Sequence, residues 1–227
     1  MVRFATNPYD LIFCENGIDR KGCIFYNASK HLHKGDVMLD ETHNKILNAT
    51  MTLLMEKGYS ATTTKDIAKK AGVNECTIFR KFDGKKEIIA TAMTLPEWNP
   101  CLREEDFRYT GELINDLCSF ANVYLKKVTP RMVKISLGLR SPDLYDITKD
   151  GIREIPDTFK RVLVKYFTEM RQQKKIHSDD IESLAIAFLS LNFGFVFFKA
   201  SFGDDLTELQ TEEYIESGVR HFVNGIV

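Results

Sequence analysis

Basic side chains are concentrated between positions 62 and 86, and this concentration is the feature of the sequence best suited to chemistry. The region holds seven lysines and arginines against three acids, a net charge of +4, whereas residues 96–227 hold 17 basic and 21 acidic residues, a net charge of −4. Ammonium and guanidinium groups bind phosphate oxygens, so a local excess of them favours contact with a nucleic acid backbone. The same run would also fit a solvated helix face. The basic residues are Lys65, Lys69, Lys70, Arg80, Lys81, Lys85 and Lys86.

Catalytic and metal-binding patterns are missing from the sequence. There is no glycine-rich phosphate loop, no G-x-S-x-G or H-E-x-x-H motif and no paired C-x₂-C spacing. We therefore expect no catalysis, no bound metal and no cofactor. The odd number of dispersed cysteines favours a reducing, cytoplasmic compartment. The scattered residues are His31, His33, His43, His177, His221, Cys14, Cys23, Cys76, Cys101 and Cys118.

The composition is that of a protein with a packed core. Hydrophobic residues make up 44% and charged residues 28% of the 227 positions, which excludes collagen-like and wholly disordered chains. The net charge of −1 means that no polybasic surface covers the whole chain. The longest apolar run, residues 184–198, is 15 residues long and includes Ser190 and Asn192. It is shorter than the ~20 residues of a membrane span, so we expect no membrane partner.

The pattern divides the chain into three parts. Residues 1–38 have no clean helical or strand period, and we treat them as an appendage of unknown order. Residues 39–95 carry short, densely capped helical segments, and residues 96–227 carry long amphipathic ones, with Pro96 and Pro100 at the boundary. We predict a small helical domain over 39–95 and a larger one over 96–227.

The small domain is predicted to hold three short helices. Asp40 can cap the first and Thr63 the second, which stops at Gly72. Asn74 can cap a third helix over residues 75–81. Two short helices joined by a tight glycine turn describe a helix-turn-helix, whose second helix enters the DNA major groove.

The stretch TTTKDIAKKAGVNECTIFRKFDGKKEII resembles the DNA-binding signature of the tetracycline-repressor (TetR) family of bacterial regulators. The resemblance covers residues 39–95, about a quarter of the chain, and the remainder agrees only in length and helical character. It implies an all-α fold, in which an N-terminal three-helix helix-turn-helix domain precedes a helical bundle for ligand binding and dimerisation. The matching positions are Thr63, Ile67, Ala68, Ala71, Gly72, Val73, Thr77, Phe79, Phe82 and Lys85.

The resemblance also implies a set of DNA contacts. Lys85 corresponds to a lysine that holds a phosphate, and Phe79 to a position where the family usually has a tyrosine, so one phosphate hydrogen bond is missing. Arg80 is the expected base reader, since a guanidinium can bind guanine O6 and N7 together, and Glu75 could accept from a cytosine amine. Cys76 is either a small residue facing the groove or a redox-sensitive thiol, and we favour the former. The expected contacts are Thr64, Lys65, Glu75, Cys76, Thr77, Phe79, Arg80, Lys81 and Lys85.

The large domain is predicted to be a bundle of amphipathic helices. Apolar residues step by three and four over residues 113–128 and 159–170. The resemblance implies that the last two helices, about residues 178–200 and 206–226, form a dimer interface. Residues 132–139 and the break at Ser141-Pro142 suggest shorter helices, which makes the segment 129–151 an irregular region that would suit a cavity.

Aromatic, methionine and asparagine side chains of this domain could line a pocket for a small, mainly apolar effector. The same residues would also fit an ordinary core. The candidates are Phe120, Tyr124, Phe167, Met170, Asn192 and Phe193.

These patterns predict a ligand-responsive transcriptional regulator, a repressor that binds double-stranded DNA at a palindromic operator. One small helix-turn-helix reads few base pairs, so paired half-sites in a homodimer raise the affinity. Two alternatives stay open: a DNA-binding regulator without a small-molecule effector, and a helical interaction protein whose helix-turn-helix is structural. The second alternative leaves the basic residues of positions 62–86 without a partner.

Overall fold

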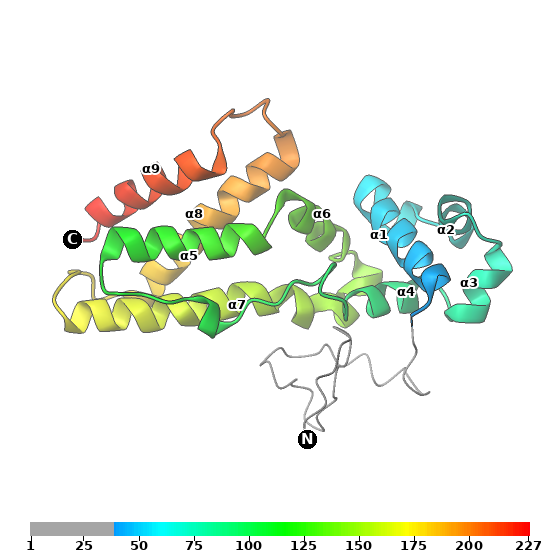
Figure 1. Cartoon of the computed structure of the whole chain (residues 1–227), viewed down its shortest axis with the longest axis horizontal. Helices are drawn as coiled ribbons and strands as arrows, with labels where there is room; N and C mark the ends of the chain where they lie inside the picture. The colour runs from blue at the N-terminus through cyan, green and yellow to red at the C-terminus, as the bar shows by residue number, and fades with distance from the viewer. Residues whose placement is uncertain (1–38) are drawn as a thin grey trace, which may run out of the picture.

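The structure is a computed structural model that describes residues 39–227, so the predicted appendage over 1–38 lies outside the described residues. The described part is all helical, as predicted, and Figure 1 shows an elongated molecule with α1 to α4 at one end. The longest helix, α7, runs along most of the bundle, and α5, α8 and α9 complete the other end. The α-helices are α1 (Glu41–Ala61), α2 (Thr64–Ala71), α3 (Glu75–Lys81), α4 (Lys85–Ala92), α5 (Leu113–Lys127), α6 (Pro130–Gly138), α7 (Pro142–Gln172), α8 (Ile181–Phe202) and α9 (Thr211–Asn224).

The first three helices begin at their predicted caps. Asp40, Thr63 and Asn74 each accept a hydrogen bond from a backbone N–H two or three residues later, at 2.9 to 3.1 Å. Gly72 ends α2 in the left-handed conformation, with φ of 68°, which favours glycine. Gly58 interrupts α1 with a different positive-φ conformation, φ of 78° and ψ of 172°. These local signals confirm the predicted helix-turn-helix.

The core of the α1–α4 end extends into the large domain. Ile135, Leu139 and Leu144, at α6 and the start of α7, are buried in the same hydrophobic cluster as side chains of α1 to α4. Leu54 of α1 lies against Gly138 of α6, where an added Cβ would be 3.0 Å from the Leu54 Cγ. The two predicted domains therefore share a tightly packed junction.

In the segment 129–151 the structure has the short helix α6 and a turn before Pro142, so the suggested shorter helix and the break at Ser141-Pro142 are confirmed, while the remainder of the segment is regular helix. Thr129 caps α6 through its hydroxyl oxygen, and α7 begins at Pro142 after a short turn. Gly151 and Pro156 both lie inside α7 without ending it. Proline removes one helical hydrogen bond, but α7 buries apolar side chains on either side of this position, and that packing maintains the helix.

The second core is built from aromatic rings of α5, α7, α8 and α9. Tyr124 stacks on Phe159 with ring centroids 4.5 Å apart, and Phe120 meets Tyr166 edge-on at 5.0 Å. Asp116 is buried among them and accepts a hydrogen bond from the Tyr166 hydroxyl at 3.1 Å. The rings fill the interior of the bundle.

Helix α8 is strongly apolar, although much of its surface is exposed to solvent. Among the described residues it is the one helix long and apolar enough to cross a membrane by length and composition, with a mean hydropathy of 1.8. A core helix passes the same test, but only 28% of the tested window of α8 is buried. An apolar face of α8 is therefore uncovered in the single chain.

Candidate nucleic-acid interface

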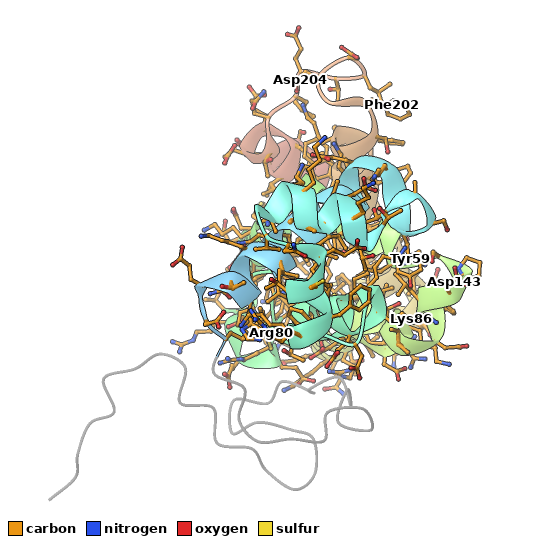
Figure 2. The ribbon with its side chains drawn as sticks, turned by 90° about the vertical axis from the view of Figure 1, so that its right-hand side faces the viewer. Tyr59, Arg80, Lys86, Asp143, Phe202 and Asp204 are labelled. Carbon is orange, nitrogen blue, oxygen red and sulfur yellow. The ribbon has the colours of Figure 1, made fainter. Side chains whose placement is uncertain are left out.

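Helix α3 lies at the surface with most of its side chains open to solvent. Ile78 is its buried residue, and Thr77 is half-buried. Cys76, Phe79 and Arg80 are exposed, Phe79 at 56%. Figure 2 looks onto the α1–α4 end and shows Arg80 on its surface. The predicted recognition helix thus presents a free face.

Four basic side chains at this end are exposed and have no hydrogen-bond or ion-pair partner among residues 39–227. A polyanion can bind such groups without breaking an internal contact. Two of them, Lys69 and Lys86, were absent from the expected contacts, because charge alone does not show which lysines are free. The four are Lys65, Lys69, Arg80 and Lys86.

Other basic side chains nearby are paired within the chain. Lys57 contacts Asp66 at 2.8 Å, and Lys70 contacts Glu56 at 2.8 Å. The hydrogen bonds from Lys57 and then from Thr63 hold the pKa of the Asp66 carboxyl well below its usual value. These pairs attach the start and end of α2 to α1.

Lys81 points away from the free face. Its ammonium lies 2.6 Å from the Asp40 carboxylate at the start of α1, and its side chain is only 14% exposed. The expected DNA contact by Lys81 remains a prediction, but in the free protein its charge is already matched.

Lys85 binds the end of α1. Its ammonium donates to the backbone carbonyls of Tyr59 and Thr62, both at 2.6 Å, and lies 3.8 Å from the centroid of the Tyr59 ring. Burial lowers the pKa of Lys85, and the nearby Asp143 carboxylate of α7 opposes that shift. Figure 2 shows Asp143 beside Tyr59. Lys85 therefore links α1 to α4 in the free protein, next to an acid from the large domain.

Thr64 and Glu75 bind each other. The Thr64 hydroxyl donates to the Glu75 carboxylate at 2.6 Å, which joins the first residue of α2 to the first residue of α3. One carboxylate oxygen of Glu75 is thus engaged, and the resemblance could not reveal this because it treats the two residues as separate DNA contacts.

The predicted ligand-binding residues lie in the aromatic core. Phe120, Phe167 and Met170 are fully buried, and Tyr124 is almost so. The Asn192 amide donates to the Phe188 carbonyl at 2.8 Å, so its polar group is satisfied inside α8. Phe193 is partly buried against this core. Phe120, Tyr124, Phe167 and Met170 thus belong to one hydrophobic core, with Phe193 at its edge.

Two shallow hollows lie outside this cluster. One, of about 250 Å³, lies along the first half of α7, and the other, of about 610 Å³, lies beside the start of α5. The first is lined by Arg140, Tyr145, Lys149, Asp150, Ile152, Arg153 and Pro156.

Within residues 39–227, no group of three His, Cys, Asp or Glu side chains is placed to hold a metal ion.

Comparison with known proteins gives consistent matches. The family model for bacterial regulatory proteins of the tetR family matches residues 46–92. An uncharacterized HTH-type transcriptional regulator of Bacillus subtilis (strain 168), YvkB, is 32% identical over 186 residues, which cover 82% of this chain and 97% of that protein. The negative transcriptional regulator IcaR of the biofilm operon icaADBC in Staphylococcus epidermidis is 28% identical, covering 70% of this chain and 84% of IcaR.

Solved structures share the fold. The flavonoid-responsive regulator FrrA is 25% identical with a TM-score of 0.51, covering 82% of this chain and 96% of FrrA. NalD of Pseudomonas aeruginosa, the secondary repressor of a multidrug efflux pump, is 18% identical with a TM-score of 0.59, covering 82% of this chain and 98% of NalD, a likeness in fold alone.

Proposed function

Because the chain belongs to the tetR family of bacterial regulatory proteins, we propose that this transcriptional regulator is a cytoplasmic repressor that binds a palindromic operator as a homodimer. We further propose that a small-molecule effector releases it from DNA. In this proposal residues 39–95 read DNA, and residues 96–227 form the dimer and bind the effector. Its relatives are transcriptional regulators, and we propose no catalytic role.

The exposed face of α3 carries the DNA-binding proposal. Among residues 39–227, Arg80 has no partner, and it belongs to a helix of which one residue is buried. Lys65 of α2 and Lys86 of α4 likewise have no partner within the described residues, and in this proposal they bind phosphates. Basic groups without internal partners around an exposed recognition helix favour a duplex over a protein partner. The helical interaction protein, our second alternative, would leave these charges unused.

The uncovered face of α8 supports the homodimer. Leu191, Phe198 and Phe202 are exposed at spacings that place them on one side of the helix, and all three are at least 40% exposed. Gly194 lies among them with no atom within 4 Å of an added Cβ, so a second helix can approach closely there. A second copy of α8 would bury this apolar surface and would hold two recognition helices for half-sites about 34 Å apart.

An effector would act by favouring a conformation in which the two recognition helices no longer fit one operator. The close packing of Leu54 on Gly138, together with Asp143 beside Lys85, supports a route from the large domain to α1 and α4. FrrA is a flavonoid-responsive regulator, and this supports a small, mainly apolar effector here. Because Phe120, Tyr124 and Phe167 are buried in the hydrophobic core, an effector that binds among them would require this core to open. A regulator without an effector stays as the alternative.

The test is a gel shift with duplex DNA taken from upstream of the gene for this chain or its neighbours. The proposal predicts a discrete, salt-sensitive complex with two chains per duplex, which competing unrelated DNA does not remove. Binding that does not distinguish this duplex from unrelated DNA would contradict it.

A further inference from the structure

A charged cluster of three side chains joins the end of α3 to the start of α1. Lys81, the last residue of α3, donates to the Asp40 carboxylate at 2.6 Å and lies 3.4 Å from Nδ1 of His43. Asp40 and Lys81 are 41 positions apart in the sequence. The cluster is therefore a direct tertiary link between two helices of the helix-turn-helix domain.

This link can influence the orientation of α3, because α3 makes few other tertiary contacts. The helix has seven residues, of which Ile78 is buried, and Phe82 follows it as a buried cap residue. The edge of the His43 ring packs against Phe82 at 5.4 Å between centroids. A helix this short is not stable by itself, so its orientation depends on a small number of contacts.

Asp40 serves two purposes with its two oxygens. One oxygen accepts from the His43 backbone N–H at 2.9 Å and caps α1, and the other accepts from Lys81. The Lys81 hydrogen bond is the largest cause that lowers the pKa of Asp40 far below its usual value, so the acid is charged whenever the protein is folded at ordinary pH. Lys81 and Arg80 are neighbours on α3 with opposite environments: Lys81 is held against α1, and Arg80 is exposed and unpaired.

We propose that Lys81 is a positioning residue that fixes the angle of the recognition helix through Asp40, and that it does not bind a DNA phosphate. This inference rests on the proposed function and deepens it. Asp40 thereby belongs to the DNA-reading machinery, although it precedes α1 as its N-cap and is negatively charged. The Asp40–Lys81 pair sets the angle at which Arg80 meets the bases.

The competing account is that Lys81 leaves Asp40 and binds a phosphate in the complex. The two accounts predict opposite signs for Asp40→Asn. If Lys81 is a phosphate contact, then removing the charge of Asp40 removes a competitor, and DNA binding becomes tighter and more salt-dependent. If Lys81 positions α3, the same change loosens the helix, and binding to the preferred sequence becomes weaker. Asparagine is as good an N-cap as aspartate, so α1 keeps its cap.

The experiment compares wild-type protein with Asp40→Asn, Lys81→Met, the double variant and Lys81→Arg. Fluorescence anisotropy measures binding to two duplexes between 50 and 200 mM salt. One duplex is selected by the wild-type protein from a randomised pool, and the other is its scrambled sequence. Lys86→Met serves as the phosphate-contact control, because Lys86 is exposed and unpaired.

We expect both single variants to bind the selected duplex about two- to five-fold more weakly, the range of a partly exposed ion pair. The double variant should bind the selected duplex no more weakly than either single variant. Lys81→Arg, which keeps the positive charge, should bind it as tightly as the wild type. The affinity for the scrambled duplex and the salt slope of binding should stay as in the wild type in these variants. Lys86→Met should instead reduce the salt slope by ~0.9. If Lys81 had a merely structural role, its replacement would weaken binding to both duplexes by the same factor.

Tighter binding or a steeper salt slope in Asp40→Asn would overturn the inference, as would wild-type affinity in both single variants. Hydrogen exchange in the free protein provides a measurement that does not involve DNA. The Phe82 amide, bonded to the Ile78 carbonyl at 2.8 Å, should exchange faster in Asp40→Asn and Lys81→Met but not in Lys86→Met. If the Phe82 amide exchanges faster in the variants but the wild-type protein selects no DNA sequence, the proposed function is contradicted. If the exchange of this amide is unchanged, the Asp40–Lys81 link itself is contradicted.

Discussion

The two ends of the molecule expose opposite kinds of side chain. Among residues 39–227, the α1–α4 end presents charged groups without partners, such as Arg80 and Lys86, around a short helix that is hardly buried. The bundle end of the described part presents apolar groups without cover, such as Leu191 and Phe198, along a long helix. A polyanion is complementary to the first surface, and another apolar surface is complementary to the second. The contrast supports the proposal of two different partners, DNA at one end and a second copy of the chain at the other.

The largest expected effect comes from a charge on the apolar face of α8. Gly194→Glu places a carboxylate where no atom lies within 4 Å of an added Cβ, so the single chain can fold around it. We expect monomers by sedimentation velocity and about 100-fold weaker operator binding, because the two half-sites are no longer bound together.

Leu137→Glu is the matched control, since Leu137 is an exposed apolar residue like Phe198 of α8 but lies on α6. It should leave the dimer intact. A Gly194→Glu protein that remains dimeric at micromolar concentration would show that the uncovered face of α8 is not the dimer interface.

A smaller effect is expected at the charged end. Arg80→Ala should weaken operator binding about ten-fold and relax the sequence preference at one position of each half-site, since a bidentate guanidinium–base contact contributes ~1 to 3 kcal/mol. Competition binding with single-base variants of the operator measures this. Lys69→Ala, which removes a free charge from α2, should weaken all sequences equally. If Arg80→Ala lowered the affinity for every sequence by the same factor, Arg80 would bind only phosphate.

Lys85→Met distinguishes a helix cap from a phosphate contact. The ammonium donates to two carbonyls at the end of α1, so we expect the free energy of unfolding to fall by about 1 kcal/mol in urea titrations. The salt slope of DNA binding should stay as in the wild type. The resemblance implies that Lys85 holds a phosphate, in which case Lys85→Met should lower the salt slope by ~0.9, and that result would contradict a role as a helix cap alone.

The smallest effect is expected at the N-terminal end of α2. Asp66→Asn removes the carboxylate that accepts from Lys57 and Thr63, and the melting temperature at pH 7 should fall slightly. Since the pKa of Asp66 is lower in the folded than in the unfolded chain, its stabilisation is complete above the ordinary pKa of 3.8 and is lost as the pH falls further. The difference between variant and wild type should therefore shrink as the pH is lowered toward 2. A difference that does not depend on pH would show that the charge is unimportant.

The sequence predicted features that depend on near neighbours and missed those that depend on distant ones. Asp40, Thr63 and Asn74 cap their helices as expected, because each cap binds an amide within three residues. The partners of Lys81 and Lys85 lie 41 and 23 to 26 positions away, beyond the reach of any local pattern.

The bundle shows the same limit. Apolar periodicity located α5 and the second half of α7, but it did not show that α7 continues through Gly151 and Pro156. Packing against other helices maintains α7 there, and this packing cannot be seen in the local sequence. The cavity was predicted from the irregularity of residues 129–151, and the aromatic candidates Phe120, Tyr124 and Phe167 are buried in the hydrophobic core.

Selection of a preferred duplex from a randomised pool tests the central claim most directly. The wild-type protein should enrich an inverted repeat with half-site centres about 10 base pairs, or a multiple of that, apart, bound by two chains. Arg80→Ala should enrich the same repeat with one position in each half relaxed. Enrichment of no sequence, or of a single unrepeated site bound by one chain, would contradict the account of a dimeric regulator that reads DNA through α3.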